Sequence, residues 1–339
     1  MAFIGTAIKT FIDLRHDLKL GSKDAGKLQR KELRKLLEKA QSTSFGIYYG
    51  FDQILDSDDP VKAFQQAIPV FEYARMNERW WRQKRRLPNI TWPGMPQYYA
   101  LSSGTPSHRS KRIPVTDDML ESIRSVGIQQ MESLANFDLD PEIFEKDILM
   151  LSSSADLQEH EGHLEGEISG INVRNFPFWT DIFYKPGQDI AKIADWDTRV
   201  DKIAERAPEW DVAAIAGIPS WILLMLKKVI ERHQLNTIHD IWPNLTVYAS
   251  GGVAFEPYRE SFNKLTERPL IIMYTYLASE GFFAFNARPE TKAMQLGVEN
   301  GIFFEFIPFD KRGFDAKGNL IEDPLCLTIE EVEEKKDYA

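Results

Sequence analysis

Apolar residues recur at helical spacing through the first ninety positions of the chain. Ile4, Ile8 and Ile12 fall on one face of a helix, and a stripe of leucine and alanine runs through residues 28–40. Spacings of three and four residues place such side chains together on one side of a helix. The pattern therefore predicts an amphipathic helix at the N-terminus and a mainly helical region over residues 1–90.

Beyond this region, short apolar runs alternate with helical patterns. Thr116 and the two aspartates after it are good helix starters, and Pro219–His233 has helical spacing. Runs rich in β-branched and aromatic residues predict strands at residues 98–101, 147–154, 245–252, 268–278 and 301–310. Strands separated by helices predict an α/β layered fold with mostly parallel strand pairing.

Composition and charge narrow the class of protein. The chain has 339 residues, 43% of them hydrophobic, and a net charge of -10, which argues against binding nucleic acid through an overall basic field. The longest strongly apolar run, Trp221–Leu226, falls far short of the roughly 20 residues that span a bilayer. Cys326 is the only cysteine, which fits a reducing compartment. We expect a cytoplasmic protein that binds neither nucleic acid nor membrane.

A hydroxyl-rich loop follows the strand predicted at residues 98–101. It contains Ser102, Ser103, Gly104 and Thr105, and Lys111 and Arg112 come a few residues later. Hydroxyls, successive backbone amides and nearby positive charge suit phosphate oxygens. The common nucleotide-kinase loop is excluded, since no second glycine precedes Lys111 and no Ser or Thr follows it. Taken alone, the stretch is more typical of an ordinary serine-rich surface loop.

Two more segments follow predicted strands farther along the chain. The first is Ser250-Gly251-Gly252, whose bare backbone would let a planar ring lie against it. The second contains Tyr276, Ser279 and Glu280, which offer a ring face, a hydroxyl and a carboxylate. Ligands collect at the carboxyl ends of α/β sheets, and a carboxylate beside a triphosphate commonly holds Mg²⁺. Each segment alone is a weak signal, because a Gly-Gly turn is most often only a turn.

The three segments in this order resemble the adenylate-forming superfamily that includes firefly luciferase and acyl-CoA ligases. The sequence is most similar to one branch, the Gretchen Hagen (auxin-responsive promoter) family of acyl acid–amido synthetases in its bacterial form. The resemblance covers roughly Leu101 to Asp310. It rests on the pieces SSGT and SKRIPVT, GHLEGEISGI, AGIPSWILLML, YASGG, YLASEG and GIFFEFIPFD.

The resemblance implies roles for individual residues. It implies that a flexible loop over the ATP phosphates is formed by Ser102, Ser103, Gly104, Thr105 and Lys111. It implies that the adenine is bordered by Ser250, Gly251, Gly252 and Tyr276. Ser279 would lie near the reacting carboxylate, and Glu280 would ligate Mg²⁺. Trp221 and Met225 would help to form the wall of the acyl-acid pocket, although two apolar residues one turn apart are more often plain core.

The same resemblance implies the reaction and the domain organisation. A small carboxylic acid would be activated by ATP and Mg²⁺ as an acyl-adenylate and passed to an amino acid, giving an amide. We expect residues 1–90 to pack on a luciferase-like large domain whose incomplete core spans residues 91–339. The Tyr-Arg-x-Gly-Asp stretch and small C-terminal lid of the family are absent, so we expect a truncated chain. An acyl-CoA ligase and a non-catalytic binding fragment remain as alternatives.

Three other features of the sequence offer candidate sites. His160 and His163 stand three residues apart among glutamates and could bind zinc, but the adjacent glycines favour a surface loop. His108 could contact phosphate, although simple exposure in its loop is the more ordinary interpretation. The basic stretch at residues 79–89 is more typical of a solvated helix face than of a nucleic-acid site.

Overall fold

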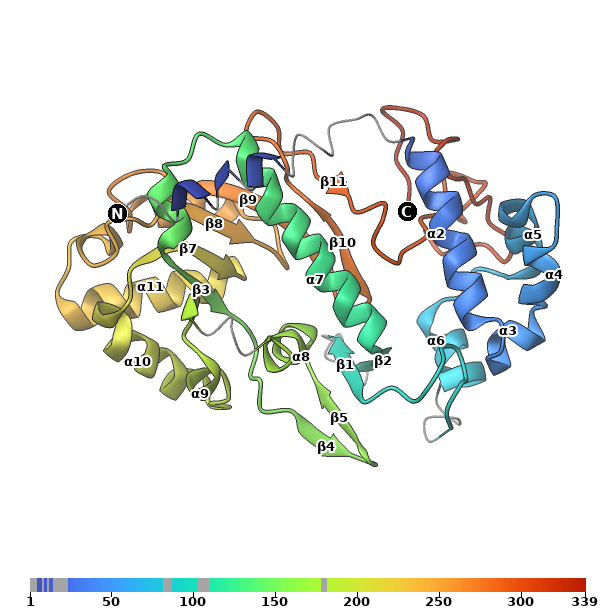
Figure 1. Ribbon diagram of the computed structural model, residues 1–339, viewed down its shortest axis with the longest axis horizontal. Coiled ribbons are helices and arrows are strands. Elements are labelled where there is room, and N and C mark those ends of the chain that lie inside the picture. The colour runs from blue at the N-terminus through green and yellow to red at the C-terminus, as the bar shows by residue number, and fades with distance from the viewer. Residues whose placement is uncertain are drawn as a thin grey trace. The chain divides into compact units, whose positions relative to one another are not determined.

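The structure is a computed structural model, and it describes residues 5–7, 9–10, 12–14, 24–81, 87–102, 110–177 and 182–339. The chain forms two compact units (Figure 1). The sheet unit contains residues 97–115 and 120–296 together with the N-terminal twenty residues. The helical unit contains residues 21–96, 116–119 and 297–339.

A seven-stranded sheet organises the sheet unit, with strand order β11-β10-β9-β8-β7-β3-β6. Its strands are β3 Asp147–Leu151, β6 Tyr184–Lys185, β7 Val212–Gly217, β8 Val247–Ser250, β9 Ile271–Ala278, β10 Gly281–Phe285 and β11 Gln295–Leu296. The pairs from β6 to β9 are parallel, whereas β9, β10 and β11 pair antiparallel. The predicted layered α/β fold with mostly parallel pairing is confirmed.

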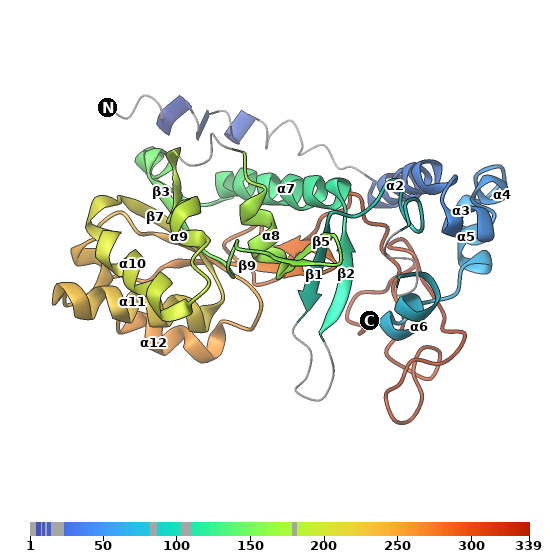
Figure 2. The ribbon, with the colours of Figure 1, turned by 90° about the horizontal axis from the view of Figure 1, so that it is seen from below.

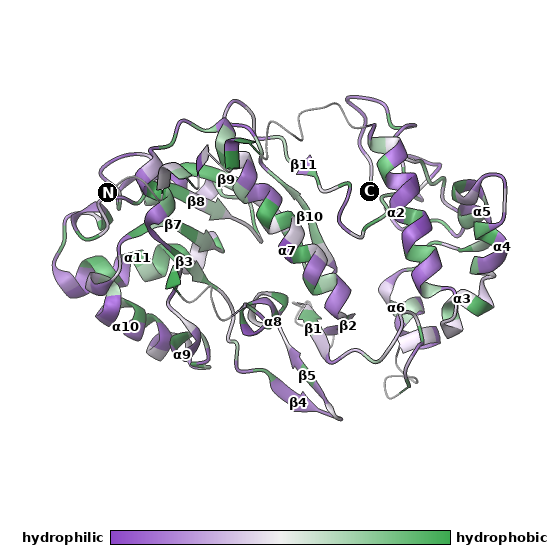
Figure 3. Cartoon of the chain, in the orientation of Figure 1, coloured by the Kyte–Doolittle hydropathy of each residue, from purple (hydrophilic) through white to green (hydrophobic). Residues whose placement is uncertain are grey.

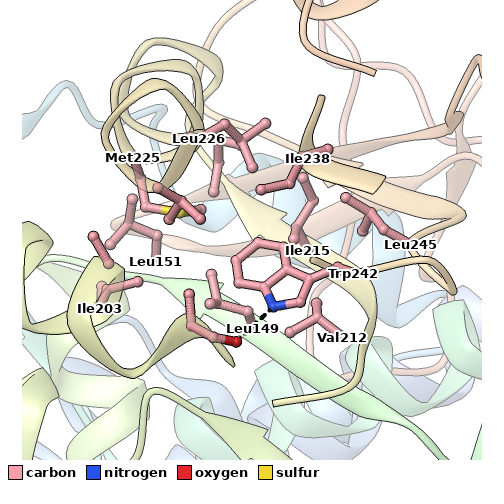
Figure 4. Close-up of a cluster of buried hydrophobic side chains, with 14 of the residues drawn as sticks. Leu149, Leu151, Ile203, Val212, Ile215, Met225, Leu226, Ile238, Trp242 and Leu245 are labelled. Carbon is pink, nitrogen blue, oxygen red and sulfur yellow. Dashed lines mark hydrogen bonds between the residues drawn. The ribbon is translucent and has the colours of Figure 1, made fainter. Parts of the chain in front are cut away.

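Helices cover this sheet on the face that carries its main core. The helices that follow β3 in the sheet unit are α8 Ile168–Arg174, α9 Gln188–Ala191, α10 Trp196–Arg206, α11 Pro219–His233 and α12 Arg259–Asn263. In Figure 2, α10, α11 and α12 lie together on one side of the sheet. Their apolar faces bury Ile215 and Met225 completely, and the buried Trp242 indole donates a 3.0 Å hydrogen bond to the Ala207 carbonyl (Figure 4).

The opposite face of the sheet is covered differently. Helix α7, Asp117–Glu132, begins after Thr116, whose hydroxyl accepts a 3.2 Å hydrogen bond from the Met119 amide. Segments following it pack Phe137 and Leu139 against the sheet residues Val247 and Met273. Figure 3 shows mixed hydrophilic and hydrophobic colour along α7, as an amphipathic helix requires.

A second sheet of four strands has the order β2-β1-β5-β4. Its strands are β1 Tyr98–Ser102, β2 Lys111–Val115, β4 Gln158–His160 and β5 His163–Gly166. Strands β4 and β5 form a hairpin whose turn residues, Glu161 and Gly162, have φ values of 51° and 87°. The expectation of a surface loop around His160 and His163 is therefore wrong. The segments on either side of Gly162 pair with each other as strands, and β5 also pairs with β1.

The helical unit matches the helical pattern of the first ninety residues. Its helices are α2 Ala25–Ala40, α3 Ser44–Tyr48, α4 Phe51–Leu55, α5 Pro60–Ala67 and α6 Tyr73–Met76, followed by the π-helix η1 Asn77–Trp81. Asp24 and Asp59 cap α2 and α5 by accepting backbone hydrogen bonds. Leu33, Leu37 and Phe51 form its buried core. In the N-terminal segment, which belongs to the sheet unit, the described residues between 5 and 14 are helical and Ile12 is buried. Ile4 and Ile8 lie outside the described residues.

The strand predicted at residues 301–310 is not formed. This segment makes only isolated bridges, Phe306 to Leu327 and Pro308 to Tyr338. Gln29 of α2, which is 2% exposed, donates to the Ile302 carbonyl at 3.0 Å and accepts from the Phe304 amide at 2.7 Å. A side chain thus satisfies the backbone groups that a neighbouring strand would otherwise pair.

The remaining helical turns are short 3₁₀ segments. They are η2 Ser133–Asn136, η3 Pro141–Glu145, η5 Ala207–Glu209, η6 Ile238–Asp240 and η7 Glu256–Tyr258. No helix among the described residues has both the length and the apolar character needed to cross a bilayer.

Candidate functional site

A bare backbone turn lies at the carboxyl end of β8. Ser250 is the last residue of β8 and pairs with Tyr274 of β9. The Thr275 hydroxyl donates a 3.2 Å hydrogen bond to the Ser250 carbonyl. A Cβ added to Gly251 would lie 2.3 Å from Thr275 Oγ1, and Gly252 has a φ of 81°. Because a side chain at Gly251 would crowd Thr275 and Gly252 adopts a left-handed backbone conformation, glycine is favoured at both positions and this turn presents main chain where other residues would present side chains.

Two buried polar residues of β8, Tyr248 and Ser250, precede this turn. Tyr248 donates a 3.1 Å hydrogen bond to the Gly217 carbonyl at the end of β7, and burial raises the pKa of Tyr248 far above its ordinary value. Ser250 is 2% exposed, and its side chain interacts with the Tyr248 hydroxyl and offsets part of the rise in the pKa of Tyr248. The carboxyl end of β8 is therefore a buried polar position.

The third predicted segment lies beside the turn. Strand β9 continues to Ala278 and reverses through Ser279 and Glu280 into β10, with Ala278 paired to Gly281. The side chain of Tyr276 is 53% exposed, and its ring packs 5.2 Å from Phe283. Glu280 is exposed at the tip of the hairpin. Strand β9, which pairs with β8 beside the glycine turn, therefore carries the Tyr276 ring, and the Glu280 carboxylate lies in the turn that follows it.

An ion-pair network braces the chain just after the turn. The Glu256 carboxylate accepts a 2.7 Å hydrogen bond from the Tyr274 hydroxyl, and it pairs with Arg259 at 3.0 Å and with Lys292 at 2.7 Å. Hydrogen bonds from Arg259, Lys292 and Tyr274 hold the pKa of Glu256 well below its usual range. Because Tyr274 is the strand partner of Ser250, this network ties the segment after Gly252 back to β9.

The predicted phosphate loop is described only at its two ends. Ser102 ends β1 and pairs with Lys111, the first residue of β2. Ser103, Gly104, Thr105 and His108 lie outside the described residues. The two ends are thus adjacent strand residues of the four-stranded sheet, and Lys111 is exposed. The structure brings the second and third segments together, and the part of the first loop that it describes lies in the other sheet.

A buried polar cluster lies at the base of this loop. The Arg112 guanidinium donates a 2.7 Å hydrogen bond from Nε to Glu165 Oε1, and His163 Nε2 lies 2.8 Å from the same oxygen. Glu165 is 5% exposed and His163 is 7% exposed, with the Tyr99 ring 4.3 Å from the imidazole. Burial alone would raise the pKa of Glu165, but the contacts with Arg112 and His163 lower it below its usual value.

Sequence reasoning considered Glu165 only as a carboxylate near His160 and His163, and it missed both the pairing of Glu165 with Arg112 and the role of Thr275. The alternation of His163 and Glu165 across an intervening leucine was a signal for a strand with both side chains on one face. No local signal indicated Thr275. Among the residues that the structure describes, no group of three His, Cys, Asp or Glu side chains is arranged to hold a metal ion.

The two predicted pocket-wall residues differ in exposure. Trp221, in the first turn of α11, is half-buried and packs against Trp196 at 5.1 Å between ring centroids. Met225 is fully buried within the main core cluster. Of the two, Trp221 is therefore the side chain with surface left to offer a ligand.

Comparison with known proteins agrees with this architecture. The chain shares the α/β fold of solved acyl acid amido synthetase structures. It is similar to the solved structure of GH3.15 acyl acid amido synthetase, with 15% sequence identity and a TM-score of 0.73 over 97% of this chain and 65% of that chain. It is also similar to AtGH3.15 acyl acid amido synthetase in complex with 2,4-DB, with 16% identity and a TM-score of 0.71 over 92% of this chain and 61% of that chain.

The family follows from the sequence match. The model of the GH3 family N-terminal domain matches residues 14–200, more than half of the chain. The chain therefore belongs to the GH3 family, and the predicted family resemblance is confirmed. It spans less than two thirds of the length of the two similar synthetase structures. No curated protein gives a significant sequence match.

Proposed function

We propose that this protein takes part in ATP-dependent activation of a small carboxylic acid as an acyl-adenylate, followed by transfer of the acyl group to an amino acid. The observation that carries the proposal is the glycine turn at the end of β8, held against Thr275 and followed on β9 by Tyr276 and Glu280. Membership of the GH3 family and the fold shared with acyl acid amido synthetases support it.

The first step is displacement at phosphorus. A carboxylate oxygen of the acid attacks the α-phosphate of ATP, the bond to the β-phosphate oxygen breaks, and pyrophosphate leaves. The reacting phosphates carry several negative charges, so the step depends on charge neutralisation and alignment. Lys111 and the backbone of the loop that starts at Ser102 supply the positive charge and amide donors in this proposal.

The glycine turn and the β9 edge would hold the rest of the nucleotide. The turn at Gly251 and Gly252 lets a planar base approach the main chain, and the half-exposed Tyr276 ring offers a second flat surface. Glu280, exposed at the tip of the β9–β10 hairpin, would hold a magnesium ion through its carboxylate. When bound, that ion would neutralise charge on the phosphates. Ser279, the residue before Glu280, would orient the carboxylic acid substrate.

The second step forms the amide. The amine nitrogen of the amino acid attacks the acyl carbonyl, the carbon–oxygen bond to AMP breaks, and AMP leaves with the electron pair. Trp221, at the start of α11 and partly exposed, is the side chain we assign to the wall of the acid pocket. Met225 would contribute only from behind it, because the core encloses its side chain.

ATP–pyrophosphate exchange against a panel of carboxylic acids tests the first step. We expect Lys111→Ala and Glu280→Ala each to lower exchange by at least about 100-fold, the usual cost of removing a group that stabilises developing charge. Lys264→Ala and Glu290→Ala, both exposed positions in the sheet unit, are the matched controls and should keep the wild-type rate.

ATP binding measured by equilibrium dialysis separates the outcomes. Binding without exchange for any acid would point to a nucleotide-binding protein rather than a synthetase. Near-normal exchange in both Lys111→Ala and Glu280→Ala would refute the site assignment while leaving the reaction itself in place. Release of AMP that depends on coenzyme A and not on amino acids would replace the proposed acceptor.

A further inference from the structure

The buried cluster around Glu165 joins three strands of the four-stranded sheet. Arg112 lies on β2 and Glu165 on β5, and β1 runs between these two strands. Their 2.7 Å contact therefore passes across the central strand. His163 contacts the same carboxylate oxygen at 2.8 Å, and Tyr99 of β1 packs on the imidazole. The cluster fastens β2 to β5 through side chains as well as through the backbone.

The cluster includes the residue next to Lys111 at the start of β2. Arg112 directly follows Lys111, which is where β2 begins and where the loop returns to the sheet. Successive side chains of a strand point to opposite faces, so Arg112 and Lys111 lie on opposite faces of β2. Strand β2 lies at an edge of this sheet, and edge strands are less constrained by backbone pairing.

We infer that Glu165 is a positioning residue for the proposed adenylation reaction: by anchoring Arg112 it fixes strand β2 and with it the direction from which Lys111 reaches the ATP phosphates. This inference rests on the proposed function. Glu165 touches neither substrate nor nucleotide in this scheme. Its carboxylate acts through Arg112, and the buried His163 and Tyr99 keep that carboxylate in place.

A purely structural role makes a different prediction from a positioning role. If Glu165 only stabilised the fold, its loss would lower the stability of the sheet unit without favouring one substrate over another. If it positions Lys111, its loss raises the KM for ATP selectively, since the phosphates are what Lys111 contacts in the proposed site. The KM for the carboxylic acid would then remain unchanged.

The test is steady-state ATP–pyrophosphate exchange with Glu165→Gln, with the two KM values measured separately. The glutamine keeps an oxygen that can accept from Arg112 but removes the charge. We expect the KM for ATP to rise about tenfold, in the range typical of partners that orient a ligand-binding residue, and the KM for the acid to stay within about twofold. Equilibrium dialysis should show the same loss of ATP affinity.

The ion pair of Asp147 and Lys185 provides a matched control in the same unit. Its charged atoms are 3.1 Å apart, both side chains are 18% exposed, and it joins β3 to β6 in the seven-stranded sheet rather than in the four-stranded one. Asp147→Asn should lower the urea midpoint as Glu165→Gln does, yet leave the KM for ATP at its wild-type value. The double variant Arg112→Gln/Glu165→Gln, in which two amides can pair, should recover part of the lost ATP affinity.

The outcomes separate this inference from the proposed function. An unchanged KM for ATP in Glu165→Gln, or an equal rise in Asp147→Asn, would overturn the positioning role and leave the proposed function standing. Wild-type protein that neither binds ATP nor exchanges pyrophosphate would overturn both. A selective rise in the KM for ATP, relieved in the double variant, would support the role of Glu165.

Discussion

The tight approach of Gly251 to Thr275 makes a substitution at this glycine a sharp test of the candidate site. In Gly251→Ala the new methyl group would lie 2.3 Å from Thr275 Oγ1. That hydroxyl already donates to the Ser250 carbonyl at 3.2 Å, so it cannot move without giving up the hydrogen bond. Either the Thr275 side chain rotates or β8 and β9 separate at their carboxyl ends.

The structure sets the size of the expected effect. Losing the hydrogen bond between Thr275 and Ser250 costs about 1 kcal/mol. Overpacking a tight contact costs a further ~1–3 kcal/mol, whereas replacing glycine returns about 0.4–1 kcal/mol by restricting the unfolded chain. We therefore expect Gly251→Ala to lower the free energy of unfolding by about 2 kcal/mol. ATP affinity should fall as well, because the displaced turn is the one assigned to the base.

A double-mutant cycle checks this reasoning by urea unfolding and ATP binding. In a Thr275→Ala background the other atoms near the new methyl group would be the Thr275 backbone oxygen at 3.5 Å and its Cβ at 3.7 Å, both ordinary contacts. Gly251→Ala should then cost less than about 0.5 kcal/mol, a coupling of roughly 1–2 kcal/mol between the two sites.

The control for this cycle is Gly127→Ala in the middle of α7, where nothing lies within 4 Å of an added Cβ. That variant should be stabilised by about 0.5–1 kcal/mol, because alanine favours the helix. Equal costs for Gly251→Ala in the two backgrounds would refute the contact as the source of the effect.

Two further predictions concern buried groups outside the nucleotide edge. Arg199 is 4% exposed, burial lowers its pKa, and its Nε and Nη1 atoms have no acceptor among the described residues. Arg199→Met should therefore keep or raise the free energy of unfolding. A loss above about 1 kcal/mol, measured by urea unfolding, would contradict this prediction. Burial, with Glu305 and Asp323 nearby, raises the pKa of Cys326 to about 11. Since the thiolate is the reactive form, iodoacetamide should label Cys326 at least about tenfold more slowly than free cysteine at pH 8, and the labelling rate should increase as the pH rises to 10. Mass spectrometry measures both labelling rates. Equal rates for Cys326 and free cysteine at pH 8 would exclude a raised pKa.

Local patterns in the sequence determined most of the elements. The helix predicted at Pro219–His233 forms with those limits, because proline suits the first helical turn and Arg232 and His233 favour the last. The strands predicted at residues 98–101, 147–154 and 245–252 also form, in somewhat shorter or longer versions. These predictions succeed because spacing and capping act over a few residues. The order of the motifs also carried the family resemblance, which the family match confirms.

Only the tertiary structure decided which distant groups meet. Spacing could not show that Thr275 closes on Gly251, that Glu165 receives Arg112 across β1, or that His163 is buried rather than exposed in a loop. It also predicted a strand at residues 301–310, where Gln29 takes over the backbone groups instead. Each of these outcomes depends on a partner far away in the sequence. Local propensity favours an element, but long-range pairing decides which neighbours satisfy its polar groups and which face is buried.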